Sequence, residues 1–218
     1  MTNPILDIQN LQITVEEKVV LEGFNLSIKE GQVVALLGPN GSGKSSVAMT
    51  LLGNSNYKIL DASKIQFLGK DLKKLSVDER AKSGLYIAWQ NPVSIPGVTV
   101  FNFCKSITTQ TGTLVEFKKY LEELLVKVGL PKEYLSRGVN EGFSGGERKR
   151  LEMLQLLLLS PKLAVLDEVD SGLDTKGVQI LAEIINELKA KGTSFLLITH
   201  NTKLTDKVKV DQVCMTTN

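Results

Sequence analysis

The sequence is poor in the residue types that build disulfide frameworks and metal centres. Its 218 residues include two cysteines and a single histidine. Cys104 and Cys214 lie far apart, without a CxxC motif or a spacing typical of metal ligands. We interpret each cysteine as a small buried apolar side chain rather than as a metal ligand.

Long apolar runs, a targeting segment and a strong charge bias are missing as well. Runs such as "LLLL" at 156–159 are far too short to cross a bilayer, and the N-terminus lacks a basic segment followed by an apolar core. The formal net charge is +2 and there is no basic tail, so the composition indicates no nucleic-acid partner. These absences predict a soluble cytoplasmic protein without direct membrane insertion.

What remains is an ordinary globular composition with two kinds of strand pattern. The first thirty residues contain short apolar runs, which predict antiparallel strands joined by turns at Glu17-Lys18 and Glu22-Gly23. Four continuous apolar runs follow, and they predict strands buried on both faces. These runs are "QVVALLG" (32–38), "GLYIAW" (84–89), "KLAVLD" (162–167) and "SFLLIT" (194–199).

Helical patterns separate the buried strands. Residues 113–128 begin with a capping box, Thr113 with Glu116, and a glycine ends them. Residues 175–190 place their apolar side chains on one face. Strands that alternate with helices predict an α/β fold with a mainly parallel sheet. Residues 100–158 are almost entirely helical in pattern, with no buried strand, and we interpret them as a helical lobe inserted into the sheet domain.

A glycine-rich loop, "GPNGSGKSS", lies between the first buried strand and a helix and fits the pattern G-x-x-x-x-G-K-[ST]. Backbone N–H groups of such a loop surround phosphates, Lys44 reaches the β and γ phosphates, and the Ser45 hydroxyl binds Mg²⁺. The predicted nucleotide-binding residues of this loop are Gly38, Pro39, Asn40, Gly41, Ser42, Gly43, Lys44, Ser45 and Ser46.

Polar residues also follow the other three buried strands. Asp167 and Glu168 end "LAVLDE" and fit a magnesium carboxylate beside a general base, although alone they could equally be solvated turn acids. Gln90 follows the second buried strand, and His200 follows the last. Because ligands of parallel sheets bind at the carboxyl ends of the strands, we expect these groups to meet Lys44 at one edge. Such a set predicts nucleotide hydrolysis.

A second candidate anion site lies about a hundred residues after the glycine-rich loop, in "EGFSGGERKR" (141–150). Ser144, Gly145 and Gly146 precede a leucine-rich helical run, so they form a helix start with free backbone N–H groups. This arrangement predicts a second grip on a phosphate. We interpret the basic run 148–150 as a solvated face of the helix.

These motifs occur in the order found in ABC-type ATPases, which the sequence resembles over nearly its whole length. The resemblance makes "SGGE" the signature motif and implies the P-loop ABC ATPase fold, with an N-terminal antiparallel β region beside a mainly parallel core. It divides the chain into an ATPase core, residues 1–89 and 160–218, and a Q-loop with an inserted helical subdomain, residues 90–159.

The resemblance also implies roles for the site residues. Glu168, His200 and Gln90 would be catalytic, with His200 as the switch histidine. Ser45, Gln90 and Asp167 would hold Mg²⁺. Besides the glycine-rich loop, the residues expected to contact ATP are Ser144, Gly145, Gly146 and, from the D-loop (171–174), Asp174. In this family two subunits pack head to tail, so a second copy would place its Ser144 over the γ-phosphate held at Lys44.

A narrower resemblance is to the SufC-type ATPases of SUF iron–sulfur cluster assembly. It is carried by "FLGKDLKKLSVDERAKSGLYIAWQNPVSIPGV", "GFSGGERKRLEMLQ" and "LDEVDSGLD". Transporter ATPases usually show LSGGQ and DEPT, where this chain has Phe143, Glu147 and "DEVD". The resemblance implies SufB/SufD-like scaffold proteins as partners and no cluster on this chain, since no cysteine or histidine set could hold one.

Two other functions share many of these features. The ATPase subunit of an ABC membrane transporter would contain every catalytic residue named above. A non-hydrolytic ATP-binding regulator is the second alternative, against which Glu168 and His200 argue. One departure from the general ABC pattern concerns recognition of the adenine ring. Val15 occupies the position where an aromatic residue usually stacks on adenine. Nucleotide affinity is therefore expected to rest mostly on the phosphates.

Overall fold

The structure, a computed structural model, describes residues 4–89, 92–108, 112–199 and 202–216. Two of the predicted site residues, Gln90 and His200, lie outside the described residues. Among the residues described, no helix has both the length and the apolar composition needed to cross a bilayer.

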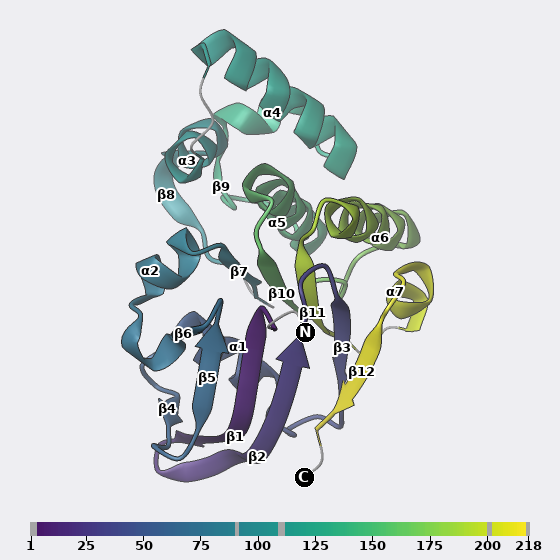
Figure 1. The fold of residues 1–218 in the computed structure, drawn as a ribbon. Coiled ribbons are helices and arrows are strands. Elements are labelled where there is room, and N and C mark those ends of the chain that lie inside the picture. Colours follow the sequence, from purple (N-terminus) through teal and green to yellow (C-terminus); the bar gives the residue numbers. More distant parts are fainter. Residues whose placement is uncertain (1–3, 90–91, 109–111, 200–201, 217–218) are drawn as a thin grey trace.

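A five-stranded parallel sheet forms the centre of the molecule, in the order β12-β3-β11-β10-β7 (Figure 1). The four predicted buried strands are present, and a fifth, β12, pairs with β3. Because β7 is an edge strand, two of its four side chains are only half-buried, which differs from the expected burial on both faces. The strands are β3 (Val33–Leu37), β7 (Leu85–Ala88), β10 (Leu163–Asp167), β11 (Ser194–Ile198) and β12 (Gln212–Met215).

The alternation of side chains along these strands creates two separate apolar cores. In β11, Phe195 and Leu197 belong to one core, whereas Leu196 and Ile198 belong to the other. The first core is covered by α4, α5 and α6, and the second by α1 and the N-terminal sheet. The helices are α1 (Lys44–Leu52), α2 (Val77–Lys82), α3 (Val100–Ile107), α4 (Leu114–Val128), α5 (Gly145–Leu159), α6 (Thr175–Ala190) and α7 (Thr202–Lys207), with 3₁₀ turns η1 (Leu72–Lys74) and η2 (Lys132–Ser136).

The N-terminal antiparallel region is confirmed, but its turns differ from the prediction. The first hairpin turns at Glu16-Glu17, where both residues have positive φ, as a two-residue hairpin of matching twist requires. Glu22-Gly23 is not a turn, because Gly23 lies within one long strand and adopts φ 66° there. The strands are β1 (Leu6–Val15), β2 (Lys18–Ile28), β4 (Lys58–Ile59), β5 (Lys64–Phe67) and β6 (Lys70–Asp71).

The region between β7 and β10 is mostly helical, as the pattern indicates. The capping box at the start of α4 is present, with the Thr113 hydroxyl accepting from the N–H of Glu116. The expectation of no buried strand is wrong in one short stretch. Val139 of β9 (Gly138–Val139) is buried and pairs with Ile95 of β8 (Ile95–Thr99). A two-residue strand has no periodicity of its own, so the sequence pattern could not reveal it.

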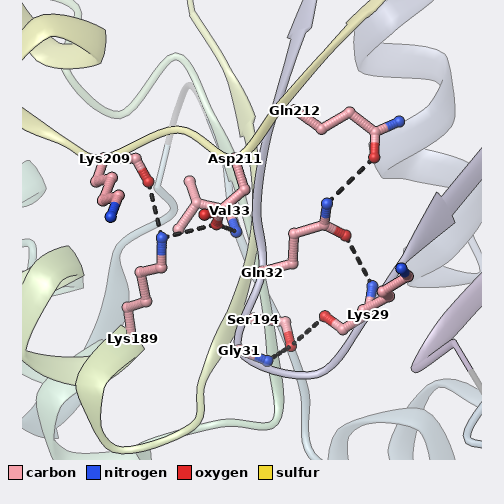
Figure 2. A network of polar contacts seen from close by, with 9 residues as sticks. All are labelled: Lys29, Gly31, Gln32, Val33, Lys189, Ser194, Lys209, Asp211 and Gln212. Carbon is pink, nitrogen blue, oxygen red and sulfur yellow. Dashed lines mark hydrogen bonds and ion pairs between the residues drawn. The ribbon is translucent and has the colours of Figure 1, made fainter. Parts of the chain in front are cut away.

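A polar network holds the amino ends of the parallel strands together (Figure 2). The Lys189 ammonium donates to the Lys209 carbonyl and to the Asp211 carboxylate, and the same carboxylate oxygen accepts from the N–H of Val33. On the other side of β3, the Gln32 amide donates to the Gln212 side chain. These contacts fasten β12 to β3 at the edge of the sheet opposite the glycine-rich loop.

Candidate nucleotide site

The glycine-rich loop joins the carboxyl end of β3 to the start of α1. Gly41 and Gly43 have φ of 84° and 85°, a region that side chains rarely adopt. A Cβ at Gly43 would lie 2.8 Å from the Val20 carbonyl oxygen, and one at Gly38 would lie 2.2 Å from Thr216 Oγ1. Gly38 and Gly43 are therefore required both by their backbone angles and by close neighbours, and Gly41 by its backbone angle alone.

The Lys44 ammonium lies over this loop. Its Nζ donates to the carbonyl oxygens of Gly38 and Pro39, at 2.9 and 2.7 Å, and the residue is only 6% exposed. These contacts use neutral acceptors, so the positive charge has no carboxylate partner among them. A phosphate at the loop would receive both the backbone N–H groups at the start of α1 and this charge.

Ser45 and Asp167 meet across the loop and the end of β10. The Ser45 hydroxyl donates to the Asp167 carboxylate at 3.3 Å, and Asp167 is buried. Burial raises the pKa of Asp167, and the hydrogen bond from Ser45 offsets part of this effect. A hydroxyl and a buried carboxylate are hard oxygen donors of the kind that Mg²⁺ prefers, and a cation would relieve the cost of burying the charged carboxylate. The residues present therefore fit a magnesium ion.

Glu168 follows Asp167 in an unusual backbone conformation. Its φ is 51°, in the left-handed region that non-glycine residues seldom occupy, and its N–H donates to the Ile198 carbonyl at 2.8 Å. Such strain persists where the surrounding structure imposes it, often at functional sites. Here it turns the chain directly after β10, at the same edge as the Lys44 loop.

Two contacts that the sequence did not predict support this edge. The Thr199 hydroxyl donates to Asp170 at 2.9 Å between buried side chains, so the residue before His200 is fastened to the chain just after Glu168. Thr216 lies 2.6 Å from the Ser42 hydroxyl and binds the loop from the far end of the chain. Asp170 stands within "DEVD" and could have been noticed, but Thr216 carries no motif.

The signature turn is a capped helix start. Ser144 Oγ accepts from the N–H of Glu147, and the Glu147 carboxylate accepts from the N–H of Ser144, which is a complete capping box. Gly145 and Gly146 follow as the first helical residues, and within the described part of the chain their N–H groups make no hydrogen bond. Two donors of the turn are therefore used internally and two remain open.

An aromatic cluster holds the Glu147 side chain. The Tyr134 hydroxyl donates to Glu147, and the Tyr134 ring packs edge-on against Phe143 with centroids 4.7 Å apart. The Arg137 guanidinium lies over both rings, at 4.4 and 4.6 Å from the ring centroids. The hydrogen bonds from Tyr134 and Ser144 lower the pKa of Glu147, so it is a carboxylate at neutral pH. Sequence patterns alone could not connect η2 with this turn.

Asp174 is used as a helix cap. One of its carboxylate oxygens accepts from the N–H of Gly177 at 2.7 Å and from Arg150 at 3.1 Å, while its side chain is 68% exposed. The interpretation of the basic run 148–150 as a solvated face is wrong. Lys149 is buried, at 5% exposure, and Arg150 also donates to the Val128 carbonyl. The middle of α5 is covered on several sides, and only the tertiary structure shows this.

The described residues therefore form two separate groups. The glycine-rich loop, Ser45, Asp167 and Glu168 gather at the carboxyl edge of the parallel sheet. Among the described residues, no hydrogen bond or ion pair joins the Ser144 turn to that edge. Gln90 and His200 lie outside the described residues, although each follows a strand, β7 and β11, that ends there.

Comparison with known proteins agrees with this geometry. A family model described as ABC transporter matches residues 21–171. The chain belongs to the ABC transporter ATPase family. It is 40% identical to "Probable ATP-dependent transporter SufC" of Escherichia coli, over 96% of this chain and 87% of that protein. It is 39% identical to "Probable ATP-dependent transporter ycf16" of Pyropia yezoensis, over 100% of this chain and 90% of that protein.

Solved structures carry the same fold. The "ATP binding subunit of ABC transporter" superposes with a TM-score of 0.82 at 26% identity, covering 97% of this chain and 85% of that one. The predicted ABC ATPase fold, with its parallel core and N-terminal antiparallel sheet, is thus confirmed. As a member of this family the chain is an ATPase. ABC ATPases bind ATP with Mg²⁺ and form dimers.

Proposed function

We propose that this chain is the ATP-hydrolysing subunit of a SUF-type iron–sulfur cluster assembly complex in the cytoplasm. The observation that carries this proposal is the 40% identity to the Escherichia coli protein named SufC, which extends over nearly all of both chains. Three sequence segments support it. "FSGGE" and "DEVD" replace the LSGGQ and DEPT motifs that are usual in transporter ATPases, and "PVSIPGV" after Gln90 resembles SufC-type ATPases.

In the proposed mechanism the Lys44 loop binds the β and γ phosphates of ATP. Ser45, Asp167 and Gln90 would hold Mg²⁺, and the bound ion would supply positive charge beside the phosphates. Glu168 accepts a proton from the attacking water, and its position directly after the buried Asp167 supports this role. His200 acts at the same edge as the switch residue.

We further propose that each site is completed by a second copy of the chain. The open N–H groups of Gly145 and Gly146, together with Ser144, would bind the γ-phosphate held at the partner's Lys44 loop. Residues 90–159 would carry this turn as one unit. ATP then stabilises the closed dimer, and hydrolysis removes the phosphate that both copies hold.

The partner in this proposal is a SufB/SufD-like scaffold, contacted through the segment after Gln90. In that segment the Val93 side chain is 74% exposed, and Trp89, which directly precedes Gln90, is 38% exposed. These two exposed apolar side chains are available to contact a partner. The contact would link the γ-phosphate site to the scaffold.

The test is the steady-state ATPase rate of the purified chain with and without a SufB/SufD-like scaffold, compared with a transporter's membrane subunit. We expect stimulation by the scaffold. Replacing Val93 by Asp should abolish that stimulation and leave the basal rate unchanged, while Val115→Asp, an equally exposed site on α4, should leave both unchanged. Stimulation only by the membrane subunit would contradict the proposal.

That last outcome would favour the second candidate, the ATPase subunit of a membrane transporter. A groove of about 710 Å³ supports this candidate, since a partner's helix could lie in it. It runs between α2, the edge strand β7 and the end of α3, and apolar residues of α5 line its floor.

A further inference from the structure

The last described residue of the chain, Thr216, lies beside the first residue of the glycine-rich loop. Strand β12 runs parallel to β3 and pairs Met215 with Leu37, so both strands reach the carboxyl edge of the sheet together (Figure 1). The Thr216 N–H continues this pairing and donates to the Leu37 carbonyl at 2.9 Å. The end of β12 is therefore placed directly against residues 38–43.

The Thr216 side chain links the loop to β3 through two hydroxyl contacts. Its hydroxyl donates to the Leu37 carbonyl at 3.3 Å and lies 2.6 Å from the Ser42 hydroxyl. A hydroxyl has a single proton, so with the Thr216 proton on Leu37 the Ser42 hydroxyl is the donor of the second contact. These two contacts connect the middle of the loop to the end of the strand before it.

The two hydroxyl groups are closely enclosed. Ser42 is 4% exposed and Thr216 is 3% exposed. A Cβ at Gly38 would lie 2.2 Å from Thr216 Oγ1, and 2.8 Å from both Ser42 Oγ and the Thr216 carbonyl oxygen. The lack of a side chain at Gly38 therefore leaves the space in which the two hydroxyl groups meet.

The contact fixes a residue that closes the turn of the loop. The Ser42 N–H donates to the Pro39 carbonyl at 3.3 Å, which closes a turn over residues 39–42. The carbonyls of Gly38 and Pro39 also accept from the Lys44 ammonium. Holding Ser42 in place therefore holds the turn that Lys44 contacts.

A loop with this composition benefits from an anchor outside it. Gly38, Gly41 and Gly43 allow the empty loop many backbone conformations, whereas phosphate binding needs the one in which the N–H groups converge. A contact that keeps the empty loop in that conformation reduces the entropy that nucleotide binding must overcome.

Attachment of β12 to the sheet does not depend on this hydroxyl. All four residues of β12 pair with β3. Near the amino end of the strand, the Asp211 carboxylate accepts from the Val33 N–H, and the Gln212 side chain accepts from the Gln32 amide (Figure 2). Loss of the Thr216 hydroxyl should therefore change the loop more than the strand.

We propose that Thr216 is a positioning residue for nucleotide binding, whose hydroxyl acts through Ser42 to hold the empty glycine-rich loop in its phosphate-binding conformation. In this role it favours binding and takes no part in hydrolysis. Because ATP and ADP both place a β phosphate in this loop, the affinities for the two nucleotides should depend on it equally. The inference rests on the proposed binding of phosphates at Lys44 and is independent of the iron–sulfur role.

Two variants break the contact from its two sides, and two others serve as controls. Thr216→Val removes the hydroxyl at nearly constant volume, and Ser42→Ala removes the donor while Thr216 keeps its bond to Leu37. Thr216→Ser retains a hydroxyl and should restore the natural behaviour. Thr193→Val makes the same change at a threonine that is also 3% exposed but lies before β11, at the opposite edge of the sheet.

The first measurement is the affinity of the purified chain for ATP and ADP, by calorimetric titration. Thr216→Val and Ser42→Ala should each weaken the binding of both nucleotides about three- to tenfold, the range expected for one hydrogen bond. KM for ATP should rise by the same factor while kcat stays within about twofold, because ground-state and transition-state binding are weakened alike. Thr216→Ser and Thr193→Val should stay within about twofold of the natural affinity.

The second measurement is hydrogen exchange of residues 38–46 without nucleotide, which reports on the empty loop itself. Exchange should be faster in Thr216→Val and Ser42→Ala, and unchanged in Thr216→Ser and Thr193→Val. If the hydroxyl served stability alone, Thr216→Val would lower the urea midpoint while nucleotide affinity and loop exchange stayed natural. That result would overturn the proposal.

The double variant Thr216→Val/Ser42→Ala tests whether the hydroxyl acts through Ser42. Its affinity should be no weaker than that of either single variant, because the same contact is lost in all three. Additive losses, natural affinity in both single variants, or an equal loss in Thr193→Val would overturn the proposal. Should Thr216→Val fail to fold, Ser42→Ala decides by the same criteria.

Lys44→Ala separates this inference from the proposed phosphate site. It should lose most of its affinity for both nucleotides. If it does so while Thr216→Val and Ser42→Ala bind them like the natural protein, the phosphate site stands and the positioning role is wrong. Natural affinity in Lys44→Ala would overturn the phosphate site, and with it this inference.

Discussion

The two halves of the predicted ATP site differ in how much of their chemistry is satisfied within one chain. At the Lys44 loop, side chains from several elements already contact one another, as in the hydrogen bond from Ser45 to Asp167. At the Ser144 turn another element holds only the Glu147 carboxylate, through the Tyr134 hydroxyl of η2, and the exposed turn itself is capped by its own two residues. The strands of the sheet bring the residues of the Lys44 half together, whereas the Ser144 turn is exposed to solvent.

The difference shows how the functional groups of each half are held in position. The carboxyl edge of a parallel sheet brings distant residues together because the strands share one direction. A helix start supplies oriented N–H groups locally and needs no other element to form. A ligand between two copies can therefore combine a rigid edge with a simple turn. The following predictions test that division.

The largest effect is expected at the sheet edge, from Glu168→Gln. Loss of the proposed base should lower the hydrolysis rate by about 10²-fold or more while ATP still binds. Glu183→Gln, on the exposed face of α6, serves as the matched control and should hydrolyse ATP at the natural rate. An unchanged hydrolysis rate in Glu168→Gln would show that Glu168 is not the general base.

The next effect tests whether the two halves belong to different chains. Ser144→Arg should block the partner's site and Lys44→Ala should disable its own, so each variant alone should be inactive. Equal mixing with scaffold should restore up to about a quarter of the sites, because half of the dimers are mixed and each has one whole site. Hydrolysis and nucleotide trapping are measured together, in case both sites must act at once.

The cap itself needs a control in this experiment, because Ser144→Arg also removes a capping box. Thr113→Arg removes the equivalent box from α4 and should leave ATPase activity unchanged. If isolated Ser144→Arg monomers bound ATP poorly, the serine would serve its own chain, and the division between the two halves would be wrong.

A smaller effect is expected where α5 contacts the Trp89 peptide, through Glu152 and Lys149. Burial raises the pKa of Glu152 from 4.5 to about 7, so this carboxyl group stays protonated to a higher pH in the folded protein than in the unfolded chain. The stabilising contribution of this group is fully present below pH 4.5 and is lost as pH rises through about 7. Glu152→Gln should remove that loss, which amounts to roughly 1–3 kcal/mol. Denaturant unfolding at pH 4.5 and pH 8 measures it.

The expected sign is specific. Relative to the natural protein, Glu152→Gln should become more stable as pH increases, whereas exposed Glu183→Gln should show no such trend. A pH-independent difference between Glu152→Gln and the natural protein would show that the carboxyl group does not titrate in this range.

The smallest effect is expected for the affinity toward different nucleotide bases, because neither half of the site is expected to stack on the base. Val15 ends β1 at the first hairpin and offers no ring for stacking. ATP and GTP should bind with affinities within about tenfold of each other. Val15→Tyr should tighten ATP binding by about 0.5–1.5 kcal/mol, and Val19→Tyr, which is exposed on β2 of the same hairpin, should not. A hundredfold preference of the natural protein for ATP would indicate another residue that reads the base.

The sequence by itself determined the fold family, the phosphate loop and the four parallel strands that lead to the site. These features follow from local patterns: apolar runs, a glycine spacing and a capping box each depend on residues close together in the chain. The sequence did not predict the turn at Glu16-Glu17, because positive φ is typical of glycine, asparagine and aspartate and not of glutamate.

The tertiary structure decided which of the charged residues are buried and what they touch. Lys149 looked like part of a solvated basic run, yet it lies beside Glu152 against the Trp89 peptide. Thr216 carries no motif, yet it contacts Ser42 from the other end of the chain. Such contacts join residues about 60 to more than 170 positions apart, and they depend on how sheets and helices pack rather than on any neighbouring residue.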